Sequence, residues 1–138
     1  MTKSVSIKFK IWIFAAFCAG QLCLCTAHAG SAPSASAQDE IAHLLNTVEK
    51  SQCEFLRNGQ WYDSTRARAH LKRKYDYLLR RGLVATSEEF IERAASVSSI
   101  SGKPYQIRCN AQAPIPSGRW LDDRLRAYRE SRIAAQKR

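Results

Sequence analysis

The segment CEFLRNGQWYD, residues 53–63, holds an Asn-Gly pair between two short runs of apolar residues. Asn and Gly tolerate the positive φ angles of a two-residue type I′ turn, so this pattern strongly indicates a β-hairpin. A loop at Asn58-Gly59 sets the cross-strand pairs Arg57–Gln60, Leu56–Trp61 and Phe55–Tyr62. Because side chains alternate along a strand, the sequence predicts a ribbon with one large apolar pair on each face.

The first 29 residues have the features of a cleaved signal peptide. Three lysines precede the 15-residue stretch IWIFAAFCAGQLCLC, and Ala27-His28-Ala29 is a typical cleavage motif. A membrane-spanning helix needs about 20 apolar residues, whereas this stretch is shorter and contains Gln21. The alternative is a lipid anchor on a leader cysteine, but bulky residues precede all three of them (Phe17, Leu22 and Leu24). We therefore expect a periplasmic or secreted protein without a transmembrane segment after cleavage.

Two cysteines, Cys53 and Cys109, remain in the expected mature chain of about 109 residues, a length that suits one small domain. An even pair of cysteines in an exported domain favours a disulfide. A reactive thiol or a metal ligand is the alternative, but no further ligand lies at metal-site spacing near either cysteine. The sequence thus predicts one disulfide, no metal site and no cofactor.

Apolar periodicity and capping residues predict four helices, at about 38–51, 65–81 and 86–96 and from Ser117 onward. The expected N-terminal caps are Ser36, Ser64, Thr86 and Ser117, and the expected end of the second helix is Gly82. Residues 30–37 are small and polar, which is typical of a disordered start, and the last helix is expected to fray beyond Ser131.

The alternation of Tyr105, Ile107 and Cys109 predicts a third strand, followed by a loop over 111–118. If the disulfide forms, this strand lies antiparallel to the first, because a parallel pairing would separate the cysteines by about 13 Å. The prediction is a single α+β domain over residues 38–138, with a three-stranded antiparallel sheet in the order 2-1-3 and about four helices.

Four segments, FLRNGQWY, AHLKRKY, TSEEFIERAASVSSISGKPYQIRC and RWLDDRL, resemble the YfeK-like family of small exported bacterial proteins, which is classed as a domain of unknown function. The positions that carry the resemblance are Phe55, Arg57–Gly59, Ala67, His70, Leu71, Lys74, Phe90, Ile91, Ser98, Ser99, Ser101, Gly102, Pro104 and Tyr105. The match covers about half of the expected mature chain. The resemblance implies an exported protein without an established activity, and it does not extend to Cys53 and Cys109.

Two groups of residues are candidates for ligand contact. His70 and Lys74 lie one helical turn apart, either as a donor pair for an anion or as a core-edge histidine beside a solvated lysine. Leu56 and Trp61 share the second face of the hairpin, and this face is either a docking surface or covered by the C-terminal helix. The full set of candidate binding residues is Leu56, Arg57, Asn58, Trp61, Tyr105, Arg108, His70 and Lys74.

No nucleophile with a paired base is evident, so no catalytic residue is predicted. We interpret the chain as a non-catalytic envelope protein that binds or modulates a partner protein or polymer through the hairpin. A small enzyme that uses His70 and Lys74 is one alternative.

Electrostatic attachment to anionic envelope polymers is a further alternative. Residues 117–138 hold seven Arg and Lys against three Asp and Glu, and the expected mature net charge is near +7. Nucleic acid is disfavoured as a partner, because this basic segment lacks interleaved aromatic residues for base stacking.

Overall fold

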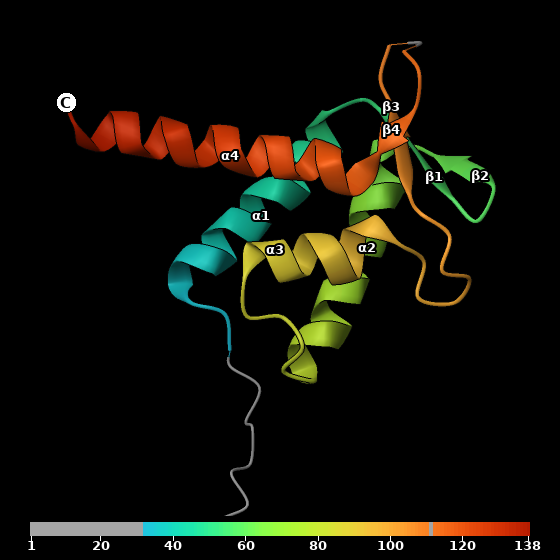
Figure 1. The fold of residues 1–138 in the computed structure, drawn as a ribbon, viewed down its shortest axis with the longest axis horizontal. Coiled ribbons are helices and arrows are strands. Elements are labelled where there is room, and N and C mark those ends of the chain that lie inside the picture. The colour runs from blue at the N-terminus through green and yellow to red at the C-terminus, as the bar shows by residue number, and fades with distance from the viewer. Residues whose placement is uncertain (1–31, 111) are drawn as a thin grey trace, which may run out of the picture.

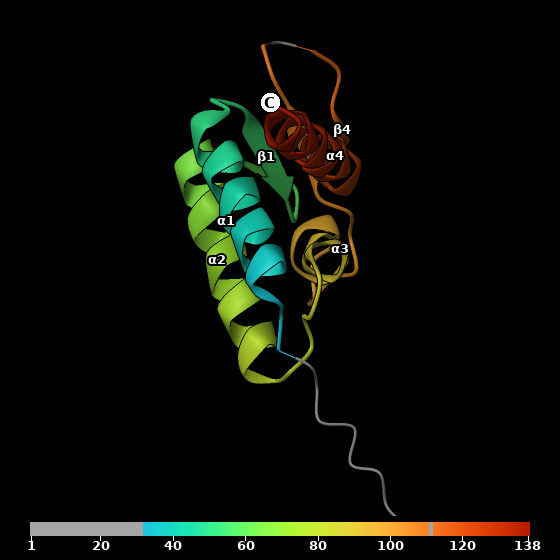
Figure 2. The same cartoon turned by 90° about the vertical axis from the view of Figure 1, so that its left-hand side faces the viewer.

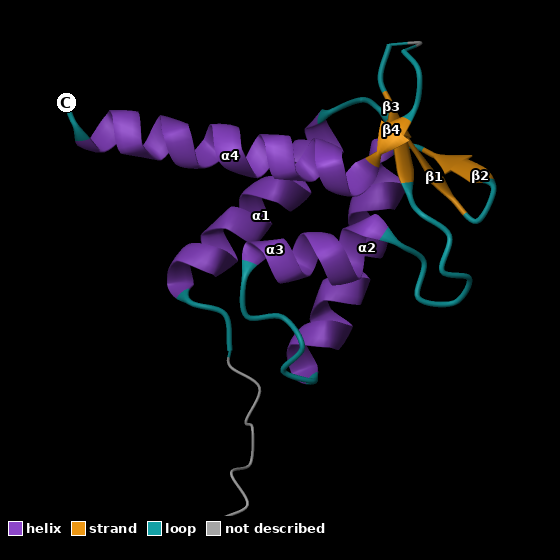
Figure 3. Cartoon of the chain, viewed as in Figure 1, coloured by secondary structure: helices purple, strands orange, loops and turns teal. Residues whose placement is uncertain are grey.

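The computed structural model describes residues 32–110 and 112–138, so the expected leader lies outside the described residues. Helices and strands combine in the predicted α+β architecture, with the strands gathered at one end of the molecule (Figure 3). In chain order (Figure 1), the elements are α1 (Ala35–Lys50), β1 (Glu54–Arg57), β2 (Gln60–Tyr62), α2 (Ser64–Arg80), α3 (Ser87–Phe90), η1 (Ile91–Ser96), β3 (Gln106–Arg108), β4 (Ile115–Pro116) and α4 (Ser117–Gln136). None of the helices in these two ranges is long and apolar enough to cross a membrane.

The helices pack in two layers around one core. α1 and α2 lie side by side, and α3 and α4 lie across the core from them (Figure 2). The most deeply buried apolar side chains come from both layers and from the sheet: Ile41, Leu44, Val48, Val84, Phe90, Ile107 and Leu121. Edge-to-face ring contacts join the layers, from Tyr75 to Phe90 at 5.6 Å and from Phe55 to Trp120 at 6.3 Å between ring centroids.

The hairpin forms in the predicted register. The cross-strand pairs are Phe55–Tyr62, Leu56–Trp61 and Arg57–Gln60. Asn58 and Gly59 have φ angles of 51° and 84°, which are the positive values that the predicted turn requires. The third strand is also confirmed as an antiparallel neighbour of β1, with Phe55 opposite Ile107.

The sheet has a fourth strand, so the predicted three-stranded sheet was incomplete. β4 pairs antiparallel with β3, and the strand order is β2-β1-β3-β4 instead of 2-1-3. This strand lies within residues 111–118, which we predicted to be a loop. It has two residues, of which Pro116 lacks an amide hydrogen, and a strand this short shows no alternation that a sequence pattern can reveal.

α1 begins earlier and α4 ends later than predicted. Ser34, rather than Ser36, caps α1, because its Oγ accepts a hydrogen bond from the amide of Ala37 at 3.1 Å. The last three residues of the stretch that we predicted to be disordered are therefore helical. α4 continues to Gln136, past the Ser131 at which we expected fraying, because Ala and Gln are favourable helix residues.

Two of the predicted capping serines serve another purpose. Asp63, not Ser64, caps α2, and no side chain caps α4. The Ser64 hydroxyl donates to a carbonyl of α1 at 3.0 Å, and the Ser117 hydroxyl donates to the carbonyl of Ala95 at 2.6 Å. A serine hydroxyl takes whichever carbonyl the packed helices place beside it, and a local pattern does not reveal that partner. The predicted Thr86 cap of α3 is confirmed.

The predicted helix over 86–96 forms, but its second half, η1, is a π-helix. The Ser96 hydroxyl donates to the carbonyl of Ile91, five residues earlier, at 2.8 Å. Gly118, in the first turn of α4, lies directly against Ser96, and a Cβ at this position would collide with the Ser96 Oγ. Glycine is therefore favoured where α4 meets η1, because a larger residue would have to displace the Ser96 side chain.

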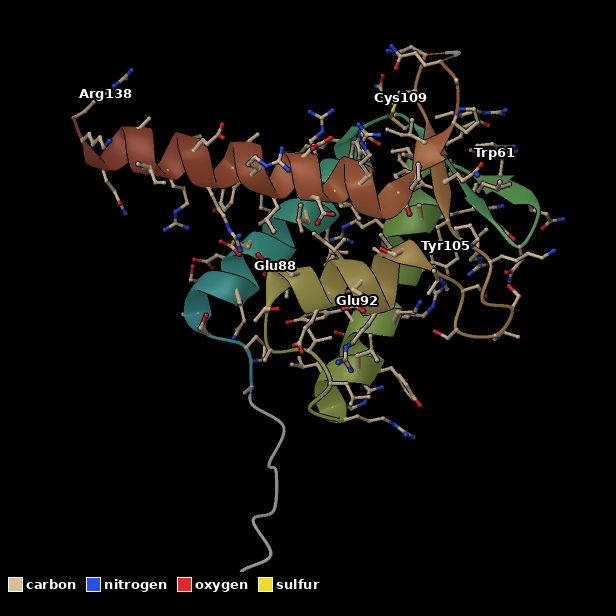
Figure 4. The ribbon with its side chains drawn as sticks, viewed as in Figure 1. Trp61, Glu88, Glu92, Tyr105, Cys109 and Arg138 are labelled. Atoms are coloured by element: carbon tan, nitrogen blue, oxygen red, sulfur yellow. A yellow bond between two sulfur atoms is a disulfide. The ribbon has the colours of Figure 1, made fainter. Side chains whose placement is uncertain are left out.

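An ion-pair group holds α4 against α1 and α3. The Arg129 guanidinium donates to both carboxylate oxygens of Glu40 at 2.8 Å and to Glu88 at 2.7 Å. The Ser87 hydroxyl donates to Glu40 at 2.7 Å, so the most buried carboxylate of this group has several donors. Figure 4 labels Glu88 in this region and Arg138 at the distant free end of α4.

The predicted disulfide between Cys53 and Cys109 is present, with Cα atoms 4.5 Å apart (Figure 4). It joins the residue before β1 to the residue after β3. The bridge therefore holds the two central strands of the sheet in their antiparallel pairing.

Reduction of this disulfide should lower the free energy of unfolding by up to about 4 kcal/mol, because the bond spans a sequence separation of 56 residues. In denaturant titrations, the midpoint of the oxidised protein should lie above the midpoint in reductant. The double variant Cys53→Ser, Cys109→Ser is the control, and its midpoint should not respond to reductant. Equal midpoints for the oxidised and reduced wild type would contradict this expectation.

Candidate functional site

The two faces of the sheet separate the candidate residues into two surfaces. On the first face, Phe55 packs against Trp120 of α4 and belongs to the core. On the second face, Trp61, Leu56 and Gln106 form a half-buried cross-strand row. The C-terminal helix therefore covers the Phe55 face and leaves the Leu56–Trp61 face to other contacts.

The Leu56–Trp61 face offers little free aromatic surface. The Arg108 guanidinium lies 4.0 Å from the centroid of the Trp61 ring. Glu54 accepts a hydrogen bond from the same guanidinium at 2.7 Å and holds it in place. Because Arg108 already occupies the ring face, a ligand would have to displace it in order to stack on Trp61.

A pocket of about 320 Å³ opens on the other side of the hairpin, between β1, β2 and α2. Its apolar wall includes Phe55, Tyr62, Ala67, Leu71, Ala95 and Leu121. Its polar groups come from β1, from α2 and from the residue before β3: Arg57, Arg66, His70, Arg73 and Tyr105. An apolar cavity of this size with a few convergent polar groups is the usual form of a small-molecule site.

Arg57, His70 and Tyr105 form a hydrogen-bonded chain along the pocket. The Arg57 Nη1 donates to the His70 Nδ1 at 2.6 Å, and the His70 Nε2 lies 3.1 Å from the Tyr105 hydroxyl oxygen. A guanidinium can only donate, so Nδ1 must accept and the ring proton must be on Nε2. Arg57 also lies over the Tyr62 ring, 4.8 Å from its centroid.

The pocket carries positive charge that no nearby carboxylate balances. Lys74 lies one turn after His70, where its Nζ donates to the carbonyl of Val97 at 2.9 Å and lies 5.2 Å from the centroid of the Tyr105 ring. Arg66, at the pocket mouth, has Asp63 at 3.7 Å. Within residues 32–110 and 112–138, by contrast, Arg57, Arg73 and Lys74 have no carboxylate partner.

The unbalanced positive charge shifts the pKa values of the groups in the site. Burial, together with the positive charges of Arg57, Lys74 and Arg73, lowers the pKa of His70 from 6.5 to about 4. Burial and the charge of Arg57 lower the pKa of Lys74 from 10.5 to about 8. Burial raises the pKa of Tyr105, so its hydroxyl keeps its proton. His70 is therefore neutral at neutral pH, and every cation of the cluster repels its neighbours.

One donor of the site has no acceptor. The Arg57 Nε is buried and has no hydrogen-bond partner among the described residues. A buried donor without a partner costs about 1–3 kcal/mol, and more when it is charged. The guanidinium therefore gains from any acceptor that reaches this edge of the group.

Four of the candidate residues meet in this cluster: Arg57, His70, Lys74 and Tyr105. Leu56 lines the same pocket, and Asn58 accepts a hydrogen bond from Ser101 at 2.8 Å beside it. Trp61 and Arg108 lie apart from the cluster, on the other face of the sheet. Figure 4 labels Trp61 and Tyr105 at separate positions near the strands.

Arg66 and Arg73 line the pocket and were missed by the sequence analysis. They lie four residues before and three residues after His70 on α2, which places all three on one helical face. The spacing of these residues was therefore enough to place them on one face of α2. The sequence did not indicate that the hairpin packs beside that face.

The described part of the chain contains no metal-ligand cluster, and the His70 ring is already hydrogen-bonded on both sides. No group of three or more His, Cys, Asp or Glu side chains there is arranged to hold a metal ion. Both ring nitrogens of His70 are engaged, one as acceptor and one as donor. The arrangement presents donors and positive charge to the pocket, which is the chemistry of anion binding.

The native His70 imidazole should titrate at about pH 4, and its titration should affect stability. The unfolded imidazole takes up its proton near 6.5 and the native imidazole only near 4, so the free energy of unfolding should decrease as the pH falls between these values. NMR titration of the imidazole signals, assigned with His43→Gln, measures the native pKa directly. In His70→Gln the loss of stability over this pH range should be smaller than in the wild type. A native pKa close to 6.5 would show that the cluster does not form in solution.

Comparison with known proteins identifies the relatives of this chain. Residues 35–129 match a family of unknown function, DUF5329. The uncharacterized protein YfeK of Salmonella typhimurium is 36% identical over 89 residues, which is 64% of this chain and 72% of that protein. No solved structure matches the chain. The protein therefore belongs to the DUF5329 family of unknown function, in agreement with the YfeK-like resemblance of its sequence.

Proposed function

We propose that this protein binds a small anionic ligand in the pocket between α2 and the hairpin, outside the cytoplasm and without catalysing a reaction. The observation that carries the proposal is a group of cations without a counter-ion. Arg57 and Arg73 line an apolar pocket, and Lys74 lies near the ring of the pocket residue Tyr105. Within the described ranges none of these three cations is paired with a carboxylate.

An anion in the pocket would reverse the repulsion within this cluster. The charge of Arg57 lowers the pKa of both His70 and Lys74, so a negative charge beside these groups would offset that repulsion. A hydrogen bond to a charged group contributes about 1.5–3 kcal/mol. The unpartnered Arg57 Nε supplies one such donor.

The hydrogen bonds of the site favour binding over catalysis. His70 uses Nδ1 to accept from Arg57 and Nε2 to contact Tyr105, so neither nitrogen is free to take a proton from a substrate. Burial raises the pKa of Tyr105, so the phenol remains a neutral donor. These features support a site that orients an anion, which is one of the two interpretations that the sequence left open for His70 and Lys74.

The other candidate functions have weaker support. Three of the seven basic residues in 117–138 are paired within the molecule, which leaves less free charge for an envelope polymer: Arg126 with Asp123, Arg129 with Glu40 and Glu88, and Arg132 with Asp39. The Leu56–Trp61 face is occupied by Arg108. The pocket is consequently the surface that the geometry supports best.

Export is part of the proposal, and processing of the leader tests it. The support is the leader-like sequence of residues 1–29 together with the disulfide, which persists in oxidising compartments. When the full chain is expressed in a Gram-negative host, the periplasmic fraction should contain a protein that begins at Gly30 by N-terminal sequencing. Recovery of the unprocessed chain in the cytoplasm alone would contradict export.

Anions should raise the Tm of the protein through Arg57. A ligand at 100 times its Kd adds about 2.7 kcal/mol to the free energy of unfolding, which is a shift of many degrees for a domain of this size. We expect a panel of organic and inorganic anions at constant ionic strength to include members that raise the Tm of the wild type. The same anions should have little effect on Arg57→Gln.

Two control variants make this test specific to the pocket. Arg119→Gln removes one exposed positive charge from α4 and should keep the full response. Trp61→Ala should also keep it, because Trp61 lies on the other face of the sheet. An equal response in Arg57→Gln and the wild type would overturn the proposed site, and a response lost in Trp61→Ala but kept in Arg57→Gln would move the site to the Leu56–Trp61 face.

A further inference from the structure

We infer that the ligand of this pocket is an amphiphilic monoanion, in which an acyl or aryl body ends in one carboxylate-type group. This inference rests on the proposed function, and it adds the chemical class of the ligand. Two features of the pocket carry it: an inner end without free polar groups and an outer end where one edge of the Arg57 guanidinium has no hydrogen-bond partner among the described residues.

The inner end of the pocket is apolar. It reaches Ala95, Leu121 and Ser117, which are all nearly inaccessible to solvent. The Ser117 hydroxyl is the one polar side chain at this end, and it is committed to the carbonyl of Ala95 at 2.6 Å. A hydrated group placed here would lose its water without gaining a partner, which is unfavourable. The inner end therefore selects a hydrocarbon portion.

The outer end of the pocket is cationic. Arg57 lies half-buried at the hairpin, and Arg66 and Arg73 lie exposed at the mouth. The Arg57 Nη1 is committed to His70, and the edge formed by Nε and Nη2 has no hydrogen-bond partner among the described residues. Two parallel N–H groups on one guanidinium edge match the two oxygens of a carboxylate. Since Nε is shielded from solvent, Arg57 would have to rotate before a ligand could reach this edge.

Both ends are needed to define the ligand. A small hydrated anion such as phosphate satisfies Arg57 but leaves the wall of Phe55, Ala67 and Leu121 uncovered. An uncharged apolar molecule covers that wall but leaves the cations of the cluster unbalanced. A molecule with one anionic end and one apolar end satisfies both, and each buried methylene should lower its Kd about fourfold.

The test is calorimetric titration of the purified, oxidised protein with straight-chain carboxylates. Butanoate, hexanoate and octanoate should bind with Kd values that fall about sixteenfold for every two added carbons until the pocket is full. Two matched controls, acetate and inorganic phosphate, are charged but lack a long apolar chain. The third, 1-octanol, has the apolar chain but no charge. All three should bind at least tenfold more weakly than octanoate.

Three variants assign the binding to the two ends of the pocket. Arg57→Gln should weaken octanoate binding at least tenfold, because it removes the charge at the outer end. Ala69→Trp should abolish octanoate binding by obstructing the mouth, and it is suited to this purpose because Ala69 is an exposed pocket residue on α2. Arg119→Gln, which removes an exposed charge elsewhere, should bind octanoate as the wild type does.

The outcomes separate this inference from the proposed function. If acetate or phosphate binds as tightly as octanoate, through Arg57, anion binding stands and the amphiphilic class is overturned. If 1-octanol binds as tightly as octanoate, the charge is not recognised and the inference is likewise overturned. If no anion binds in a way that depends on Arg57, both the inference and the proposed function fail.

An acyl-bearing anion can be a free acid or a lipid that remains in a bilayer, and a second titration distinguishes these sources. Vesicles of phosphatidylglycerol in phosphatidylcholine replace octanoate, with pure phosphatidylcholine as the control. Capture by the anionic vesicles that is lost in Arg57→Gln would identify a bilayer lipid as the source. Binding of octanoate without such capture would identify a free acid.

Discussion

The disulfide between Cys53 and Cys109 determines which ends of the strands come together, and the pocket depends on that choice. Because the bridge joins the residue before β1 to the residue after β3, the two strands can only run antiparallel. Arg57 at the end of β1 and Tyr105 before β3 consequently lie at the same end of the sheet. α2 places His70 between them, although His70 is 13 residues from Arg57 and 35 residues from Tyr105 in the sequence.

The cations at this end of the sheet are held by neutral groups and not by acids. Arg57 donates to the neutral His70 ring and lies over the ring of Tyr62. Lys74 donates to a backbone carbonyl and lies near the ring of Tyr105. Lone pairs and aromatic faces orient a cation without cancelling its charge. The protein thereby fixes the geometry of the cluster without neutralising its charge, whereas Arg129 of α4 is fixed by carboxylates and is neutralised.

Sequence analysis predicted the features of this fold that depend on local patterns. The hairpin register followed from Asn58-Gly59 and the alternation around it, and the strand direction followed from the cysteine pair. His70 and Lys74 were predicted as a pair from their helical spacing, and Arg57 was a candidate on the hairpin with no predicted contact to that pair. These residues form one pocket because α2 packs against the hairpin. Contacts between residues so far apart in the chain do not produce a periodic pattern in the sequence, so they could not be predicted from it. β4 was missed for a related reason. It is a strand because it pairs with β3, and its own composition does not indicate one.

The π-helix η1 is the segment in which the chain can lose a residue with the least disturbance to the fold. A π-helical turn holds one residue more than an α-helical turn, so η1 is equivalent to an α-helix with a single inserted residue. Loss of one residue from this segment would restore the α-helical pattern and leave both of its ends in register. The same loss from α2 would rotate every later side chain by about 100° and carry the basic face away from the pocket. Length variation among relatives is therefore expected to accumulate in this segment, next to Ser96.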